Sequence, residues 1–461
     1  MPEPGSRASV SAVLRIRPFR RLWLVLAVSS VGDWLGLLAT SAFAAGRFSS
    51  PVAQGAAFGG VIAVRLLPAL VLGPLAGVLV DRFDRRRTMI VCDVLRFALF
   101  ASIPAVGLVS GPGPAVGWAA AATFLIEALA MVWSPARDAA VPNLVPRAHL
   151  EAANRLSLAT TYGVTPVVAA LVMAGLGGLA HLADPVTVAL YLNALTFLVN
   201  AGVLATAVPE LSGRPHPAAH PGIRRELGEA WRFVLRTAFV RGLVAGILVA
   251  FGGAGVVIGA IQRFAASVHG GGAAFPLLFA ALFAGMALGV AAGPALAHVL
   301  PHRRWFAVAL VVAGGSVALL ALAPDPVTAA AACVGTGAGA GLAFLVGWTL
   351  LGGEVGDDIR GRVFAFVEAG GRIALLVAIA VSSVLSGLGD PVRGVPAIRF
   401  VLLGAGAAVL LAGWAGLRPG DESPPARGRT TTSRDARGTV ASGRGAKRHR
   451  RCRCATRTDG A

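Results

Sequence analysis

Charged residues are scarce in this sequence. Asp, Glu, Lys and Arg make up 14% of the 461 residues, against about 25% in a typical soluble domain, and the mean hydropathy is +0.73. Long runs of Ala, Val, Leu and Gly recur instead from Leu22 to Leu417. About 18 or more apolar residues with few charges can cross a bilayer as a helix. The composition therefore excludes a water-soluble protein and predicts a membrane protein with many spans.

Cysteine and histidine are also few, and neither forms a pattern that would support chemistry. Two of the four cysteines, Cys92 and Cys333, lie in apolar runs, and the other two, Cys452 and Cys454, lie in the C-terminal tail. This distribution excludes a disulfide framework and a zinc site. The eight histidines are scattered and form no metal-spaced pair with an acid. We therefore expect no enzyme activity, no metal and no cofactor.

Hydropathy divides the chain into apolar segments that are each long enough to span a bilayer. We predict an all-α membrane protein with twelve transmembrane helices at residues 22–46, 56–80, 88–109, 115–134, 154–178, 183–208, 239–265, 273–299, 305–323, 327–351, 363–388 and 396–417. The first segment is longer than the roughly 7 to 15 residues of a signal-peptide core. We therefore interpret it as a retained helix.

Basic residues outnumber acidic ones, and the formal net charge is +19. Because this charge falls in short loops between apolar segments, it indicates membrane orientation rather than nucleic-acid binding. One set of alternate loops, with the N-terminal segment, holds almost all the loop arginines: Arg15, Arg17, Arg20, Arg21, Arg82, Arg85, Arg86, Arg87, Arg137, Arg147, Arg155, Arg214, Arg224, Arg225, Arg232, Arg236, Arg303, Arg304, Arg360 and Arg362. The positive-inside rule then places both termini in the cytoplasm, as expected for a plasma-membrane protein.

The loop after the sixth helix divides the chain into two halves. GPLAGVLVDRFDRRR ends the second helix, and the related GPALAHVLPHRR ends the eighth. Two homologous six-helix halves that face one another form a transporter architecture with its site near the midplane. The linker contains an amphipathic segment, IRRELGEAWRFVLR, suited to the membrane surface. We predict a cytoplasmic N-terminus at 1–21, the first half at 22–208, the linker at 209–238 and the second half at 239–417. A disordered basic tail follows at 418–461.

Asp33 is one of several ionisable residues inside the apolar segments. It follows Arg21 by twelve residues, which places it about 18 Å from the inner end of its helix, near the midplane. Ionisable groups at such a depth mark function or pair with each other. We predict that Asp33 is a proton-coupling carboxylate. The alternative is a permanent pair with Arg65, which lies about 6 Å nearer the outside.

Further intramembrane charges suggest ion pairs. Glu127 and Arg96 both lie about 12 Å from the inner face and could pair, and Asp93, three residues before Arg96, competes for the same guanidinium. Arg65 and Glu127 are also candidates for proton coupling or substrate binding. Glu368 and Arg372 are spaced i, i+4 with the acid first, which is the favourable order. For these groups we favour structural pairing, with a proton or substrate relay as the alternative.

The sequence resembles the major facilitator superfamily. Gly77, Asp81, Arg82, Arg86 and Arg87 match its loop signature of a glycine, three residues, Asp-Arg and a basic cluster. A drug and siderophore efflux branch, similar to enterobactin exporters, is also matched by SVGDW, RLLP, DVLR, SPARDAAVPNLVP and IRGRVFA. The resemblance implies a monomeric secondary transporter whose partners are the lipid bilayer and a small molecule. It implies proton-coupled export of a small hydrophobic or amphipathic compound, with H⁺ as the coupling ion.

The signature residues also suggest a latch on the cytoplasmic side. Asp81 ends the second helix, and the eleventh helix begins on the same side just after Gly361 with unpaired N–H groups. An anion there could hold the halves closed, Gly77 would permit close approach, and the arginines would pair with carboxylates or anionic lipid. The alternative is that the arginines serve topology alone.

Two other patterns point elsewhere. GTGAGAG, from Gly335 to Gly341, looks like a dinucleotide loop, but it lies in an apolar segment, so we interpret it as small-residue helix packing. The N-terminal half, including RPFRRLWLVL, is most similar to the membrane half of actinobacterial chains fused to a thymidylate kinase. The expected P-loop is missing from this sequence, because GRGAKR lacks its spacing. The alternative function is therefore a membrane module derived from such a fusion, transporting or not, without kinase activity.

Overall fold

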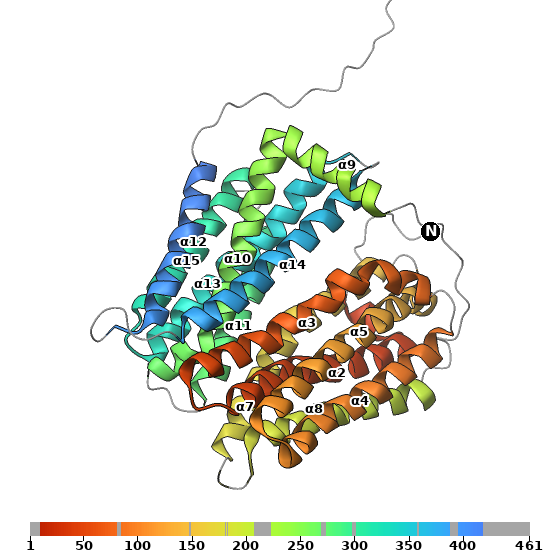
Figure 1. The fold of residues 1–461 in the computed structure, drawn as a ribbon. Coiled ribbons are helices and arrows are strands. Elements are labelled where there is room, and N and C mark those ends of the chain that lie inside the picture. Colours follow the sequence, from red (N-terminus) through yellow and green to blue (C-terminus); the bar gives the residue numbers. More distant parts are fainter. Residues whose placement is uncertain are drawn as a thin grey trace, which may run out of the picture. The chain divides into compact units, whose positions relative to one another are not determined.

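The computed structural model describes most of the chain up to residue 417. The described residues are 10–80, 84–146, 149–179, 181, 183–206, 223–268, 273–296, 301–356, 359–387 and 395–417. Twelve spans in this part of the chain are helical, long and apolar enough to cross a membrane, as the hydropathy predicted. The protein is therefore a multi-pass membrane protein with an all-helical fold (Figure 1).

The helices follow the predicted segments with small differences at their ends, except that the fourth, predicted at 115–134, extends to Leu144. In the N-terminal half they are α1 (Val10–Leu14), α2 (Arg17–Ala45), α3 (Pro51–Val80), α4 (Arg85–Val109), α5 (Pro112–Leu144), α6 (Leu150–Ala159), the π-helix η2 (Thr160–Val164), α7 (Thr165–Gly178) and α8 (Pro185–Thr206). The linker helix α9 (Ile223–Arg236) is followed by α10 (Ala238–Ser267), α11 (Ala274–Leu296), α12 (His302–Leu322), α13 (Pro326–Glu354), α14 (Arg360–Leu385) and α15 (Ala397–Leu417). The predicted amphipathic linker segment thus coincides with α9, whereas the fifth span is not one uniform helix.

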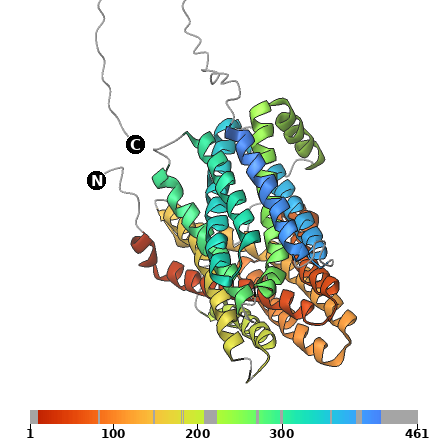
Figure 2. The same cartoon turned by 90° about the vertical axis from the view of Figure 1, so that its left-hand side faces the viewer.

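The two halves repeat the same pattern of helix packing. In the N-terminal half, α4 packs on α8 and α5, α2 on α8 and α7, and α3 on α5. The equivalent helices pair in the same way in the C-terminal half: α12 on α15 and α13, α10 on α15 and α14, and α11 on α13. Figures 1 and 2 show the two bundles, red to yellow and green to blue. This repetition confirms the predicted pseudo-symmetric architecture of two six-helix halves.

Glycines allow the helices of the C-terminal half to approach to backbone contact. A Cβ atom on Gly337 of α13 would lie 1.9 Å from the carbonyl oxygen of Leu282 on α11, and one on Gly341 would lie 2.3 Å from the carbonyl of Met286. A Cβ atom on Gly339 would lie 2.5 Å from the backbone nitrogen of Ala313 on α12. Small residues that bring backbones together drive helix association in membranes. The segment from Gly335 to Gly341 is therefore a packing motif, as predicted.

Several arginines near the helix ends bind carbonyl groups that a helix C-terminus leaves without a partner. Arg399 donates from its two terminal nitrogens to the carbonyls of Ala321 and Ala323 at 3.2 and 3.0 Å, at the end of α12. Arg47 donates to the carbonyl of Gly107 near the end of α4 at 2.9 Å. A cation at this position also interacts favourably with the helix dipole. These arginines therefore stabilise the helix ends.

The most extensive contacts between the halves are made by two symmetry-related helix pairs, α3 with α14 and α7 with α11. Arg263 of α10 donates to the carbonyl of Pro51 at the start of α3 at 2.9 Å. A Cβ atom on Gly55 would lie 2.1 Å from the carbonyl of Ser383 on α14. Pro51 and Ser383 lie at helix ends that the arginine asymmetry predicts to face outward. The described contacts between α3 and α14 therefore lie toward that side.

Candidate functional site

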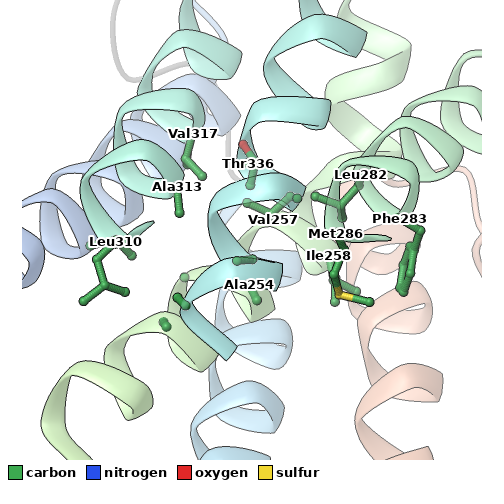
Figure 3. A pocket seen from close by; sticks show the side chains of 16 residues that line it. Ala254, Val257, Ile258, Leu282, Phe283, Met286, Leu310, Ala313, Val317 and Thr336 are labelled. Atoms are coloured by element: carbon green, nitrogen blue, oxygen red, sulfur yellow. The ribbon is translucent and has the colours of Figure 1, made fainter. Parts of the chain in front are cut away.

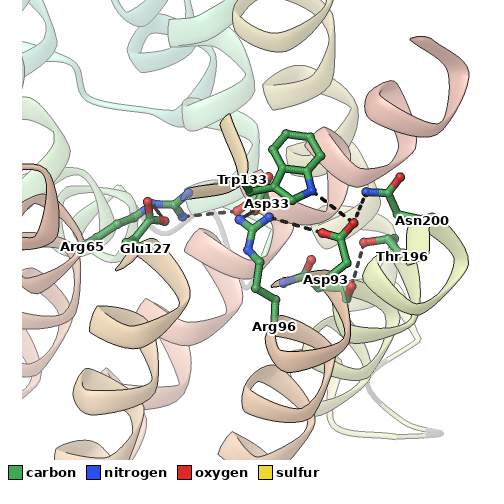
Figure 4. Close-up of polar contacts among 9 residues, drawn as sticks. Asp33, Arg65, Asp93, Arg96, Glu127, Trp133, Thr196 and Asn200 are labelled. Atoms are coloured by element: carbon green, nitrogen blue, oxygen red, sulfur yellow. Dashed lines mark hydrogen bonds and ion pairs between the residues drawn. The ribbon is translucent and has the colours of Figure 1, made fainter. Parts of the chain in front are cut away.

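Five ionisable side chains from four helices of the N-terminal half meet inside the bundle (Figure 4). We call this group the charge cluster; it consists of Asp33 on α2, Arg65 on α3, Asp93 and Arg96 on α4, and Glu127 on α5. Nη2 of Arg96 lies 2.9 Å from Oδ1 of Asp33, and Nε of Arg65 lies 2.7 Å from Oε1 of Glu127. Arg65 also donates to the backbone carbonyl of Asp33 at 3.3 Å. Asp33 therefore links the two ion pairs.

The predicted pairing of these residues is wrong, because the partners are exchanged. We expected Arg65 as the alternative partner of the Asp33 carboxylate and Arg96 as the partner of Glu127, whereas the structure joins Arg96 to Asp33 and Arg65 to Glu127. The rise per residue gives the depth of a residue along its helix. It does not give the rotation of the helix about its axis, which decides where the side chain points. Since α3 packs directly on α5, Arg65 reaches Glu127.

Asp93 is held by neutral donors in addition to Arg96. Its side chain is 0% exposed, and its Oδ2 accepts hydrogen bonds from Nδ2 of Asn200 at 2.7 Å and from Nε1 of Trp133 at 3.3 Å. Oδ1 lies 3.9 Å from Nη1 of Arg96, so Asp93 shares this guanidinium with Asp33 and not with Glu127, the predicted competitor. These contacts fix Asp93 in place as a structural anchor for Arg96.

Arg96 is almost completely enclosed, whereas Asp33 is not. The Arg96 side chain is 4% exposed and that of Asp33 is 29% exposed. The guanidinium of Arg96 also lies over the ring of Phe197 on α8, 4.2 Å from its centroid, where a desolvated cation is attracted to the π face. Asp33 is therefore a carboxylate of the cluster that remains accessible while its partner is fixed.

The charge cluster holds three carboxyl groups and two guanidinium groups. When all are ionised the cluster carries one excess negative charge, and an uncompensated charge inside a membrane protein is costly. One bound proton or one monovalent cation would make the cluster neutral.

The fifth span is interrupted by η2 beside the charge cluster. Within η2 the hydrogen bonds shift by one residue, so that the N–H of Thr165 bonds to the carbonyl of Thr160. The N–H of Thr165 is therefore not available to the carbonyl of Thr161. The residue five positions after Thr161 is Pro166, which has no N–H to donate. The Thr161 carbonyl accepts instead from Nε1 of Trp34 at 2.9 Å and from the Thr165 hydroxyl at 2.9 Å. Such π-bulges are frequent at functional sites.

An aromatic face on α11 meets Trp34 from the other half of the protein. Phe275, Phe279 and Phe283 are spaced four residues apart and so lie on one side of the helix. The ring centroid of Phe283 lies 4.8 Å from that of Trp34 in an edge-on arrangement, and that of Phe279 lies 6.2 Å away. Trp34 follows Asp33 in the sequence, so the charge cluster lies next to a contact between the two halves.

Several of these residues were not predicted as part of the site. These residues are Asn200, Trp133, Trp34 and the three phenylalanines of α11. The aromatic residues among them do not stand out, because apolar segments commonly contain aromatic residues. The spacing of the phenylalanines was a usable signal. So was Asn200, because a buried amide in an otherwise apolar span needs a hydrogen-bond partner.

The second predicted intramembrane pair also forms. Nη2 of Arg372 lies 2.5 Å from Oε1 of Glu368 on α14, one helical turn apart. Their side chains are 36% and 52% exposed, so this pair is not enclosed between helices as Asp93 and Arg96 are. It lies apart from the charge cluster.

The predicted cytoplasmic latch falls largely outside the described residues. Asp81 and Arg82 lie outside them, and Gly77 lies in α3, whose backbone is described there. The latch therefore stays a prediction.

In the parts of the chain that the structure describes, no group of three or more His, Cys, Asp or Glu side chains is placed to hold a metal ion.

The described arginines of the signature bind helix ends. Arg86 donates from Nε to the carbonyl of Leu204 at 2.8 Å and from Nη2 to the carbonyl of Ala205, so it binds the C-terminus of α8 rather than the predicted carboxylate or lipid. The backbone N–H of Arg87 donates to Oδ1 of Asp84, the N-cap of α4, at 2.9 Å. The free carbonyls at the end of a helix attract a guanidinium, which explains the position of Arg86.

Known transporters are similar to parts of this chain. The multidrug efflux pump Tap of Mycobacterium tuberculosis is 30% identical over 193 residues, which cover 40% of this chain and 43% of that protein. An uncharacterized MFS-type transporter of the same species is 33% identical over 162 residues, or 34% of this chain and 35% of the relative. The chain thus matches less than half the length of each of these relatives.

Solved transporter structures share the whole fold. The nucleoside transporter NupG has a TM-score of 0.65 and 14% identity, and the match covers 87% of this chain and 98% of NupG. A bacterial homologue of the iron transporter ferroportin, in an inward-facing state, has a TM-score of 0.65 and 16% identity over 88% of this chain and 98% of its own. Residues 22–352 match the family description of these transporters, which are not enzymes. The chain belongs to the Major Facilitator Superfamily.

Proposed function

We propose that this chain exports a small hydrophobic or amphipathic compound from the cytoplasm in exchange for protons. It acts as a monomer in the plasma membrane with both termini in the cytoplasm. The observation that carries the proposal is the charge cluster, in which three carboxyl groups face two guanidinium groups inside the bundle. The similarity to a multidrug efflux pump over 193 residues supports the direction of transport.

Asp33 is the coupling residue in this proposal. Its carboxylate is 29% exposed and bonded to one guanidinium, so a proton can reach it, whereas Asp93 is enclosed and held by Trp133 and Asn200. A proton on Asp33 neutralises the cluster and weakens its attraction for a cationic group. Loss of that proton restores one negative charge, which attracts the cation again. Proton and substrate thus compete for one site, and alternating access turns this competition into exchange.

A proton-release assay in everted membrane vesicles tests this function. A pH gradient is loaded, and hydrophobic cations, macrolides and siderophores are added to wild-type protein, Asp33→Asn and the control Asp184→Asn. Asp184 is exposed before α8, where it accepts backbone hydrogen bonds, so this control makes the same change outside the cluster. We expect at least one compound to collapse the gradient with wild-type and control protein and none with Asp33→Asn.

Two results would contradict the proposal in different ways. If Asp33→Asn still collapses the gradient with the same compound, Asp33 is not the coupling residue. If none of the compounds collapses the gradient when the wild-type protein is folded and inserted, proton-coupled export is wrong. The membrane module without transport would then be the better interpretation.

A further inference from the structure

The C-terminal half contains an apolar cavity of about 100 Å³ (Figure 3). Residues of α10, α11, α12, α13 and α15 line it. No ionisable side chain is among the lining residues, and the hydroxyl of Thr336 is already bonded to the carbonyl of Ala332 at 2.9 Å. A cavity of this kind offers no polar partner to water. Apolar cavities of roughly 150 Å³ in proteins stay dry and bind benzene, so this one has the scale of a small apolar group.

The cavity is sealed on one side and partly open on the other. Leu310, Ala313 and Val317 of α12 are buried, whereas Ala254 of α10 and Met286 of α11 are only half-buried. A closed packing defect would have buried residues on all sides. The half-buried residues therefore mark the side from which a group could enter.

The cavity is connected to the charge cluster through one aromatic contact. Phe283 lines the cavity and also packs edge-on against Trp34 of the N-terminal half at 4.8 Å. Trp34 follows Asp33 and is fixed by its bond to the Thr161 carbonyl.

The two features also lie at the same depth along equivalent helices. Asp33 lies sixteen residues after Arg17, the first residue of α2, and Ala254 lies sixteen residues after Ala238, the first residue of α10. Because α2 and α10 occupy equivalent positions in the two halves, the negative site and the apolar cavity face the same level of the molecule.

Resting on the proposed transport function, we infer that the cavity is the binding site for the apolar group of the substrate, whose cationic end binds at Asp33. The substrate class is then a monovalent organic cation that carries one apolar group no larger than a single ring. Trp34, which follows Asp33, contacts Phe283, which lines the cavity, and an aromatic face can also bind a cation.

Equilibrium binding of two probes to the purified full chain tests this inference. N-methyl-4-phenylpyridinium carries a charge and a ring for the cavity, and N-methylpyridinium lacks that ring. A single methylene group in a hydrophobic pocket changes binding roughly 10- to 200-fold, so a larger phenyl ring should make the wild-type protein prefer the phenyl probe by at least about tenfold. Asp33→Asn should weaken both probes and leave their ratio unchanged.

Variants that fill the cavity identify the place where the ring binds. Ala254→Leu and Ala340→Leu each extend a side chain from the lining into the cavity. Each should remove the preference for the phenyl probe, so that the ratio of the two affinities falls to about one. The binding of N-methylpyridinium should not change. Ala245→Leu is the matched control, because Ala245 is exposed on the same helix as Ala254 and does not line the cavity. Thermal unfolding is measured for every variant to show that it is folded.

The outcomes separate this inference from the proposed function. Absence of phenyl-probe binding or of any preference in the wild-type protein overturns the inference and needs no variant. If the preference survives in both filled variants while their melting temperatures rise, the cavity is only a packing void. Collapse of the pH gradient in the vesicle assay would still support proton-coupled export in either case.

Discussion

The two halves of this protein share their helix packing and differ in what they hold at the centre. The N-terminal half holds the charge cluster, whereas the C-terminal half holds an apolar cavity and glycines that meet the backbone of neighbouring helices. Since the same five helix pairings form in both halves, the fold does not require buried charge. Buried ion pairs are weak contributors to stability. Small residues therefore suffice to build the bundle, which is consistent with the coupling role that we propose for the charge cluster.

The largest expected effect comes from removing the central cation of the cluster. Arg96→Leu leaves the carboxylates of Asp33 and Asp93 without their guanidinium, and breaking a buried pair costs about 3–5 kcal/mol. We expect this loss in the free energy of unfolding, measured by denaturant titration in micelles. The control Arg372→Leu removes an arginine from an exposed pair, for which about 0–1 kcal/mol is usual. Equal losses in the two variants would contradict the distinction between the halves.

A smaller effect should come from the glycine contacts of the C-terminal half. The methyl group of Gly337→Ala would lie 1.9 Å from the Leu282 carbonyl oxygen, so α11 and α13 must separate, at a cost of about 1–3 kcal/mol. Gly404→Ala on α15 is the control, because a Cβ atom there meets nothing within 4 Å. Thermal unfolding in detergent compares them. An unchanged melting temperature for Gly337→Ala would show that close packing does not hold this half together.

Arg86 and Arg87 allow a finer comparison between neighbouring residues of one motif. Arg86→Gln removes the guanidinium from the carbonyls of Leu204 and Ala205, and a cation at a helix C-terminus contributes about 0.3–1 kcal/mol. Arg87 is exposed, so Arg87→Gln should change stability less. The same unfolding titration measures both. A larger effect of Arg87→Gln would show that its side chain has a structural role, as the predicted latch would require.

The smallest effect concerns Asp325, outside the membrane-spanning segments. The backbone N–H of Thr328, then its hydroxyl, and the N–H of Val327 donate to this N-cap carboxylate and hold its pKa below the ordinary value. The contribution of this carboxylate to stability is therefore fully present at pH values above its ordinary pKa. It is lost as the pH falls through the lowered pKa of the folded protein. The difference in melting temperature between wild type and Asp325→Ala should shrink on acidification. A difference that grows in acid would contradict this sign.

Much of the fold followed from the sequence, but the arrangement of the site did not. Hydropathy and arginine positions predicted the twelve spans and the linker helix, because both depend on local composition. The pairing of Asp33, Arg65, Arg96 and Glu127 depends on the rotation of helices that are distant in sequence, so the sequence predicted intramembrane ion pairs but neither the correct partners nor a single cluster. The bond from Trp34 to η2 and the cavity depend on packing between spans, which a single sequence does not reveal.

The central claim is that the charge cluster exchanges one proton for one cationic substrate. The most direct test measures protons released when N-methyl-4-phenylpyridinium binds to the purified protein in weakly buffered micelles, using a pH indicator. Three carboxyl groups against two guanidinium groups predict the release of up to one proton per bound cation from wild-type protein, at a pH where the cluster is neutral. Asp33→Asn should release none. Binding without release at any pH, or unchanged release from Asp33→Asn, would contradict the account.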